Sequence, residues 1–166
     1  VLTIPDSRLR IKAEPIAQVD DSVRQLMADL METMYAEEGA GLAATQVGIN
    51  KRVIVFDISD TFPNLPPMKM ANPEIIWRSK ETVISVEACL SVPEQFANVK
   101  RFKAVRVRYL DENNQQHELE GEDLLAKCLQ HEIDHLDGVV YIDHLSSLKR
   151  QLIIQKVQRL KKLFKL

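Results

Sequence analysis

The segment His131-Glu132-Ile133-Asp134-His135 constrains this chain more than any other feature, because it lies where apolar residues recur with helical spacing, from Glu122 to about Asp137. On a helix, positions i and i+4 lie about 6 Å apart along the axis and about 40° apart around it, so both imidazoles can reach one ion. Glu132, between them, has the position of a general base. The pattern predicts a mononuclear metal-dependent hydrolase whose metal is held by His131 and His135.

A helical projection at 100° per residue separates the faces of this helix. One arc, predicted to face the site, carries Leu124, Cys128, His131, Glu132 and His135. An adjoining apolar sector carries Leu125, Leu129, Ile133 and Leu136, and the sector predicted to face solvent carries Asp123, Lys127, Gln130, Asp134 and Asp137. Unpaired histidines are costly to bury, which favours metal ligation. Two structural core histidines remain the alternative at this stage.

The third ligand does not follow from the two histidines. Thermolysin-type peptidases take it from a downstream glutamate, and residues 136–166 contain none. The metzincin pattern fails because Tyr141 stands where its third histidine is needed. Cys128 on the same helix would make the ligand set span about 10.5 Å, so it is interpreted as a small buried residue beside the site. Cys89, in a separate strand-like segment, is the expected third ligand.

Such a ligand set leaves a fourth position open for water, as in catalytic sites. A bound ion would lower the pKa of that water toward ~7, and Glu132 could take its proton.

The other elements indicate an α+β fold, with antiparallel or mixed sheets around the central metal-binding helix and with further helices at both ends of the chain. Asp20 or Asp21 begins a predicted helix that Gly39 ends. Residues 39–48 read as a tight loop and 61–73 as a proline-containing surface loop. Strands are predicted over 52–58, 82–92 and 104–110, and a turn at 111–116 leads to a further short strand.

Composition places the chain among ordinary globular proteins. At 166 residues we expect a single catalytic domain over 1–166. Two cysteines and no signal-peptide pattern predict a cytoplasmic protein, and no apolar stretch approaches the ~20 residues that span a bilayer. The predicted last helix, 146–166, is basic, because seven cations and no acidic residue follow Asp143; without them the net charge of −2 becomes −9.

Three motifs in order, GAGLAATQ (39–46), EACLS (87–91) and HEIDH (131–135), resemble those of the peptide deformylases of bacteria and organelles. Pro5, Arg8 and Leu9 match the family's N-terminal segment, so the resemblance covers essentially the whole chain. It implies removal of the N-formyl group from the initiator methionine of nascent polypeptides, with release of formate.

Carried over residue by residue, the resemblance makes Cys89, His131 and His135 the metal ligands and Glu132 the base. It also implies that the Gln46 amide and the Leu90 backbone N–H stabilise the oxyanion. The expected ion is Fe²⁺, for which Ni²⁺, Co²⁺ or Zn²⁺ can substitute. We expect the substrate to contact Ala40, Gly41, Leu124 and Cys128, where Gly41 lets the backbone approach the formyl amide closely.

The chain departs from the family pattern at a few positions. Ala88 replaces a usual glycine and requires a negative φ, Phe96 stands where arginine is frequent, and Ala40 and Ser85 replace bulkier aliphatic residues of the methionine pocket. The departures at Ala88, Ser85 and Phe96 keep an inactive deformylase-like binding protein open as an alternative. A metallopeptidase that uses the same water chemistry is the other alternative. The resemblance also implies that the basic C-terminal helix could dock to the ribosome. A solvated face is the simpler interpretation of its run of cations. We expect a monomer without membrane contact.

Overall fold

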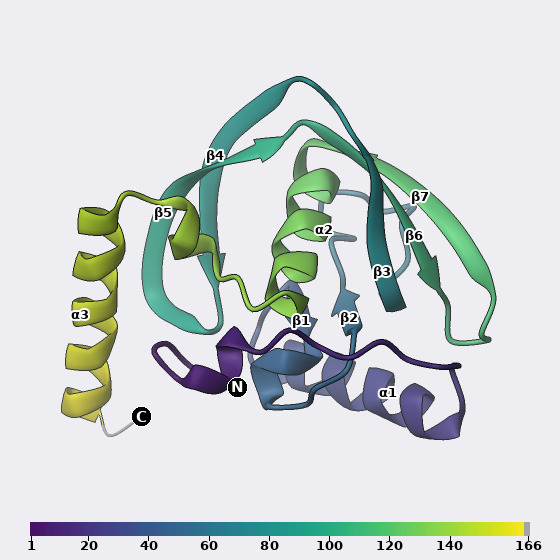
Figure 1. Ribbon diagram of the computed structural model, residues 1–166, viewed down its shortest axis with the longest axis horizontal. Helices are drawn as coiled ribbons and strands as arrows, with labels where there is room; N and C mark the ends of the chain where they lie inside the picture. The colour runs from purple at the N-terminus through teal and green to yellow at the C-terminus, as the bar shows by residue number, and fades with distance from the viewer. Residues whose placement is uncertain (165–166) are drawn as a thin grey trace.

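The computed structural model describes residues 1–164 (Figure 1). Within this range it contains the helices α1 (Asp21–Ala36), α2 (Asp123–Leu136) and α3 (Ser147–Phe164). Its strands are β1 (Gly41–Ala43), β2 (Val53–Phe56), β3 (Met68–Arg78), β4 (Thr82–Cys89), β5 (Val92–Phe102), β6 (Ala104–Leu110) and β7 (Gln116–Glu122). Short 3-10 helices lie at Ser7–Arg10, Ala44–Val47 and Tyr141–His144.

The strands form two antiparallel sheets, one of five strands in the order β1-β2-β3-β6-β7 and one hairpin of β4 and β5. Figure 1 shows α2 at the centre, between the β4–β5 hairpin and strands β3, β6 and β7. Helix α1 packs against β1 and β2, and α3 lies against β5 at the outer side. The predicted α+β class, with a central helix and helices at both ends, is confirmed.

Helix α1 follows its local sequence signals. Asp20 caps it, since its carboxylate accepts a hydrogen bond from the Val23 N–H at 3.1 Å. The predicted apolar face is buried against β2 and contributes Val23, Leu26, Met27, Leu30, Met31 and Met34 to the core. The central sheet and α2 enclose a second cluster that includes Ile54, Phe56, Val105 and Leu129.

Strand β3 contradicts the predicted surface loop at 61–73, because it begins at Met68. Pro73 is accommodated at a register irregularity between Ala71 and Glu74, where Asn72 has a φ of 50°. Residues 93–102, for which the sequence pattern predicts no element, form most of β5. The predicted loop at 39–48 contains β1 and a 3-10 helix, because residues 41–43 pair with β2.

The two predicted C-terminal elements are present. Helix α2 ends just before Gly138, whose φ of 75° suits glycine. Helix α3 begins at Ser147, after the Ser146 hydroxyl accepts a hydrogen bond from the Lys149 N–H. The last two residues of the predicted 146–166 helix lie outside the described residues. Across 1–164, every helix is too short or too polar to cross a bilayer.

Candidate metal centre

Two elements bring the predicted metal ligands together. Cys89 ends β4 after an irregularity in its pairing with β5, whereas His131 and His135 lie one turn apart on α2. One donor atom from each residue lies within 4.8 Å of the other two, and the Cys89 Sγ lies 3.3 Å from the His135 Nε2. The carboxyl end of a strand and the inner face of a helix thus converge on one point. Cys128 is not part of this cluster, as its position on the helix predicts.

The chemistry of these donors fits a divalent metal ion. The His131 Nδ1 is 2.8 Å from the Glu87 Oε1, which leaves its Nε2 available as a ligand. Burial holds the pKa of His135 well below its ordinary value, so this imidazole is neutral and able to coordinate. One thiolate and two imidazoles suit iron, nickel, cobalt or zinc and leave a position open for water or substrate.

A buried ion-pair network, which the sequence analysis missed, holds His131. Burial raises the pKa of Glu87, but hydrogen bonds from Arg101 and His131 outweigh it and bring this pKa to about 2. The Arg101 guanidinium binds both Glu87 oxygens, at 2.7 and 2.9 Å, and the Asp134 carboxylate at 2.6 Å. His144 lies 2.8 Å from the same carboxylate. One feature of the sequence could have indicated that Arg101 is buried. Alternate residues of a strand share a face, so Arg101, two residues after the apolar Val99, would point to the same inner side.

The α2 sector predicted to face solvent is partly wrong. Gln130 is only 5% exposed, because its side-chain amide hydrogen-bonds to the backbone N–H and C=O of Phe102. Asp134 is half-buried against Arg101. Strand β5, which was not predicted, covers this face, so polar residues that look solvated in the helical projection pair with it.

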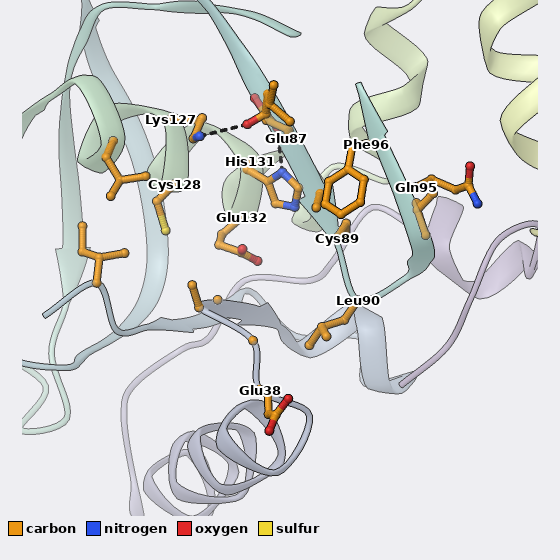
Figure 2. A pocket seen from close by; sticks show the side chains of 18 of the residues that line it. Glu38, Glu87, Cys89, Leu90, Gln95, Phe96, Lys127, Cys128, His131 and Glu132 are labelled. Atoms are coloured by element: carbon orange, nitrogen blue, oxygen red, sulfur yellow. Dashed lines mark hydrogen bonds and ion pairs between the residues drawn. The ribbon is translucent and has the colours of Figure 1, made fainter. Parts of the chain in front are cut away.

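The segment 44–47 positions Gln46 behind Cys89. The Gln46 Oε1 accepts a hydrogen bond from the Ala43 N–H at 2.9 Å, and its Nε2 donates to the Ser91 Oγ at 3.0 Å. The same Nε2 lies 3.4 Å from the Cys89 Sγ. Leu90, at the turn between β4 and β5, stands on the pocket rim (Figure 2). Gln46 and Leu90 are therefore both near the donor cluster.

Glu132 faces the cavity next to the donor cluster (Figure 2). Burial raises the pKa of its carboxyl to about 7, and within residues 1–164 no hydrogen-bond donor reaches its Oε1. A Cβ at Gly41 would lie 2.9 Å from the Glu132 carboxylate carbon. The glycine therefore leaves room for this carboxylate, a reason that the sequence did not reveal.

The cavity beside these residues has a volume of about 390 Å³. The predicted substrate residues Ala40, Gly41, Leu124 and Cys128 all line it, and Ile58, Val86 and Phe96 line it as well. Burial raises the pKa of the Cys128 thiol well above its ordinary value, so this thiol is uncharged. Ser85 lines a neighbouring hollow instead. The φ of Ala88 is negative, so its Cβ is accommodated.

Comparison with known proteins places this geometry in context. A family model described as polypeptide deformylase matches residues 1–151. The peptide deformylase of Methylocella silvestris is 50% identical over 166 residues, covering 98% of this chain and 85% of its own length. That of Rickettsia canadensis is 46% identical, covering 97% of this chain and 95% of its own length.

Among solved structures, the peptide deformylase of Ehrlichia chaffeensis superposes with a TM-score of 0.95 at 39% identity, covering 100% of this chain and 98% of that one. The peptide deformylase of Legionella pneumophila gives a TM-score of 0.92 at 40% identity, with 99% and 96% covered. The two histidines and the cysteine meet beside a cavity in a chain that these proteins match along its whole length. The chain therefore belongs to the peptide deformylase family of metal-dependent hydrolases, which remove the N-terminal formyl group.

Proposed function

We propose that this chain removes the formyl group from the N-terminal formyl-methionine of newly made polypeptides and releases formate. The observation that carries the proposal is the position of the Cys89, His131 and His135 donor atoms, within 4.8 Å of one another, beside a cavity that Glu132 also faces. This arrangement joins a potential metal site, a carboxylate base and space for a side chain.

In this proposal Cys89, His131 and His135 hold one divalent ion, with ferrous iron as the resident metal and nickel, cobalt or zinc as substitutes. When bound, such an ion acts as a Lewis acid and makes water nucleophilic near neutral pH. Glu87 keeps His131 oriented through its Nδ1, which is the usual way in which a carboxylate supports a ligating imidazole.

Glu132 is the proposed general base. Its carboxylate takes a proton from the attacking water and then delivers it to the methionine nitrogen as the formyl C–N bond breaks. Burial raises its pKa to about 7, which suits a group that must both accept and donate a proton near neutral pH.

Further residues of the site are assigned to stabilising the oxyanion and to contacting the substrate. We assign the oxyanion to the Gln46 amide and the Leu90 backbone N–H, each worth a few kcal/mol of transition-state stabilisation. The Gln46 amide group is supported for this role by hydrogen bonds at both ends. We assign the methionine side chain to the cavity that Leu124, Cys128, Ala40 and Gly41 line.

The proposed substrate emerges from ribosomes, so we propose that the protein acts as a monomer in the cytoplasm and docks to ribosomal RNA through α3. Support for docking comes from the exposed cations of α3 and from the absence of acidic residues between 147 and 164.

Anaerobically purified protein loaded with iron or nickel should release formate from formyl-Met-Ala-Ser. Glu132→Ala should lose nearly all of this activity while still binding metal, and Glu118→Ala, on exposed β7, should match the unaltered protein. Cleavage of longer peptides without formate would instead support a metallopeptidase. Metal binding without turnover would support a binding protein.

A further inference from the structure

Tyr141 stands where the metzincin pattern needs a third histidine, and the proposed function gives it no role. The structure places its aromatic ring against the imidazole of His131. The two ring centroids lie 6.1 Å apart and the ring planes meet at 25°, which is a stacked arrangement. The Tyr141 hydroxyl donates its hydrogen bond elsewhere, to the Gln95 carbonyl at 3.2 Å. Tyr141 therefore packs against a predicted metal ligand with its ring, while its hydroxyl is engaged with β5.

The backbone turn after α2 carries Tyr141 back to His131. Gly138 reverses the chain with a φ of 75°, and a Cβ at this position would collide with the backbone of the N-terminal segment. The Asp143 carboxylate then accepts a hydrogen bond from the Val140 N–H at 2.9 Å and fixes the start of the 3-10 helix that follows. These contacts hold the first residue of that helix beside the metal-binding face of α2.

Packing prevents the Tyr141 ring from moving away. The side chain is 1% exposed and belongs to an apolar cluster that joins the N-terminal segment, β5 and α3. Figure 1 shows the chain after α2 passing β5 on its way to α3. Because protein interiors are close-packed and the hydroxyl is anchored to β5, the ring is a fixed surface for the imidazole. The cluster includes Leu9, Val92, Val99 and Val157.

The His131 imidazole needs such a surface because its own torsion does not fix its plane. Rotation about the Cβ–Cγ bond of a histidine has broad minima. The Glu87 Oε1 lies 2.8 Å from the Nδ1 and restrains one ring atom, but a hydrogen bond tolerates a range of ring tilts. The His135 ring meets the imidazole edge-on, with centroids 5.1 Å apart and planes at 70°. Stacking on Tyr141 restrains the ring plane, and with it the direction of the Nε2.

We propose that Tyr141 is a positioning residue, whose ring sets the plane of the His131 imidazole and so aims its Nε2 at the metal site. This inference rests on the proposed function, which makes His131 a metal ligand. The role belongs to the aromatic ring, so Tyr141→Phe preserves it and Tyr141→Leu removes it. The hydrogen bond to Gln95 is an additional anchor for a ring that its neighbours already hold.

Cobalt binding tests the proposal, because the visible absorption of a bound Co²⁺ ion changes with the geometry of its ligands. We expect Tyr141→Leu to weaken Co²⁺ affinity about tenfold in competition with a chelator and to shift the absorption bands. Tyr141→Phe should keep these bands and retain the affinity within about threefold. Tyr141→Met, a second variant without a ring, should match Tyr141→Leu.

Tyr109→Leu is the matched control. Tyr109 is 8% exposed and stacks on His117, with centroids 5.6 Å apart and planes at 28°, and neither residue belongs to the donor cluster. Its replacement also removes a buried tyrosine from the face of a histidine, so urea unfolding should show a comparable loss of stability for both leucine variants. Only Tyr141→Leu should change the affinity for cobalt and the cobalt spectrum.

An unchanged cobalt spectrum and affinity in folded Tyr141→Leu and Tyr141→Met would overturn the proposal. So would a Tyr141→Phe variant that loses as much affinity as Tyr141→Leu, because the hydroxyl and not the ring would then be responsible. An equal change in Tyr109→Leu would reduce the effect to general destabilisation and would also overturn it. Unaltered protein that binds no Co²⁺ through Cys89 and the two histidines would instead refute the proposed function itself.

Discussion

Replacement of Glu87 by alanine should weaken both the fold and the metal site. The Glu87 side chain is 2% exposed and binds Arg101, itself 6% exposed, and His131. Its removal leaves the guanidinium with Asp134 as its carboxylate partner. Breaking a buried ion pair from one side typically costs about 3–5 kcal/mol, a large share of the about 5–15 kcal/mol that stabilises a domain. Loss of the carboxylate behind a ligating histidine typically lowers metal affinity about 10–100-fold.

Urea unfolding measures the first effect, and metal titration against a competing chelator measures the second. Glu120→Ala is the matched control, since its pair with Arg106 lies on the neighbouring strands with both side chains about half exposed, and it should cost under about 1 kcal/mol. The metal affinity of Glu87→Gln should fall between those of Glu87→Ala and Glu120→Ala, because the amide oxygen of the glutamine can still accept a hydrogen bond from the His131 Nδ1. Equal stability losses for the Glu87 and Glu120 alanine variants, or unchanged metal affinity, would refute the reasoning.

Three further predictions concern the active site, acid stability and the basic helix. Gly41→Ala should lower kcat at least tenfold with metal still bound, because its Cβ displaces the Glu132 carboxylate; wild-type kcat would contradict this. The folded pKa of Glu87, about 2, lies below the ordinary 4.5, so its stabilisation, about 3 kcal/mol, is present above pH 4.5 and is lost as pH falls to 2. Unfolding free energies should fall less steeply in this window for Glu87→Gln. Ribosome co-sedimentation should weaken with salt and on reversing the α3 cations, and salt-insensitive binding would exclude electrostatic docking.

Local spacing accounts for what could be predicted. The i and i+4 positions of His131 and His135 follow from helix geometry alone, and Gly138 lies just beyond α2 for an equally local reason. After α1 the left-handed position belongs to Glu38, with a φ of 58°, and not to Gly39. Cys89 was reached by excluding other ligands, and its proximity to the histidines depends on β4 meeting α2. The roles predicted for Gln46 and Leu90 rest on the family resemblance of their motifs and not on local physics.

Long-range pairing decided the rest. The segment 68–73 is a strand because β2 and β6 hydrogen-bond to β3 on both sides, despite Pro73. Gln130 is buried because β5 covers it, and no pattern within α2 reveals that neighbour. The sequence by itself therefore determined the metal-binding helix and the likeness of the chain to the deformylases. Tertiary structure alone decided the Glu87–Arg101 support and the space that Gly41 leaves for Glu132, since each depends on residues far apart in the chain.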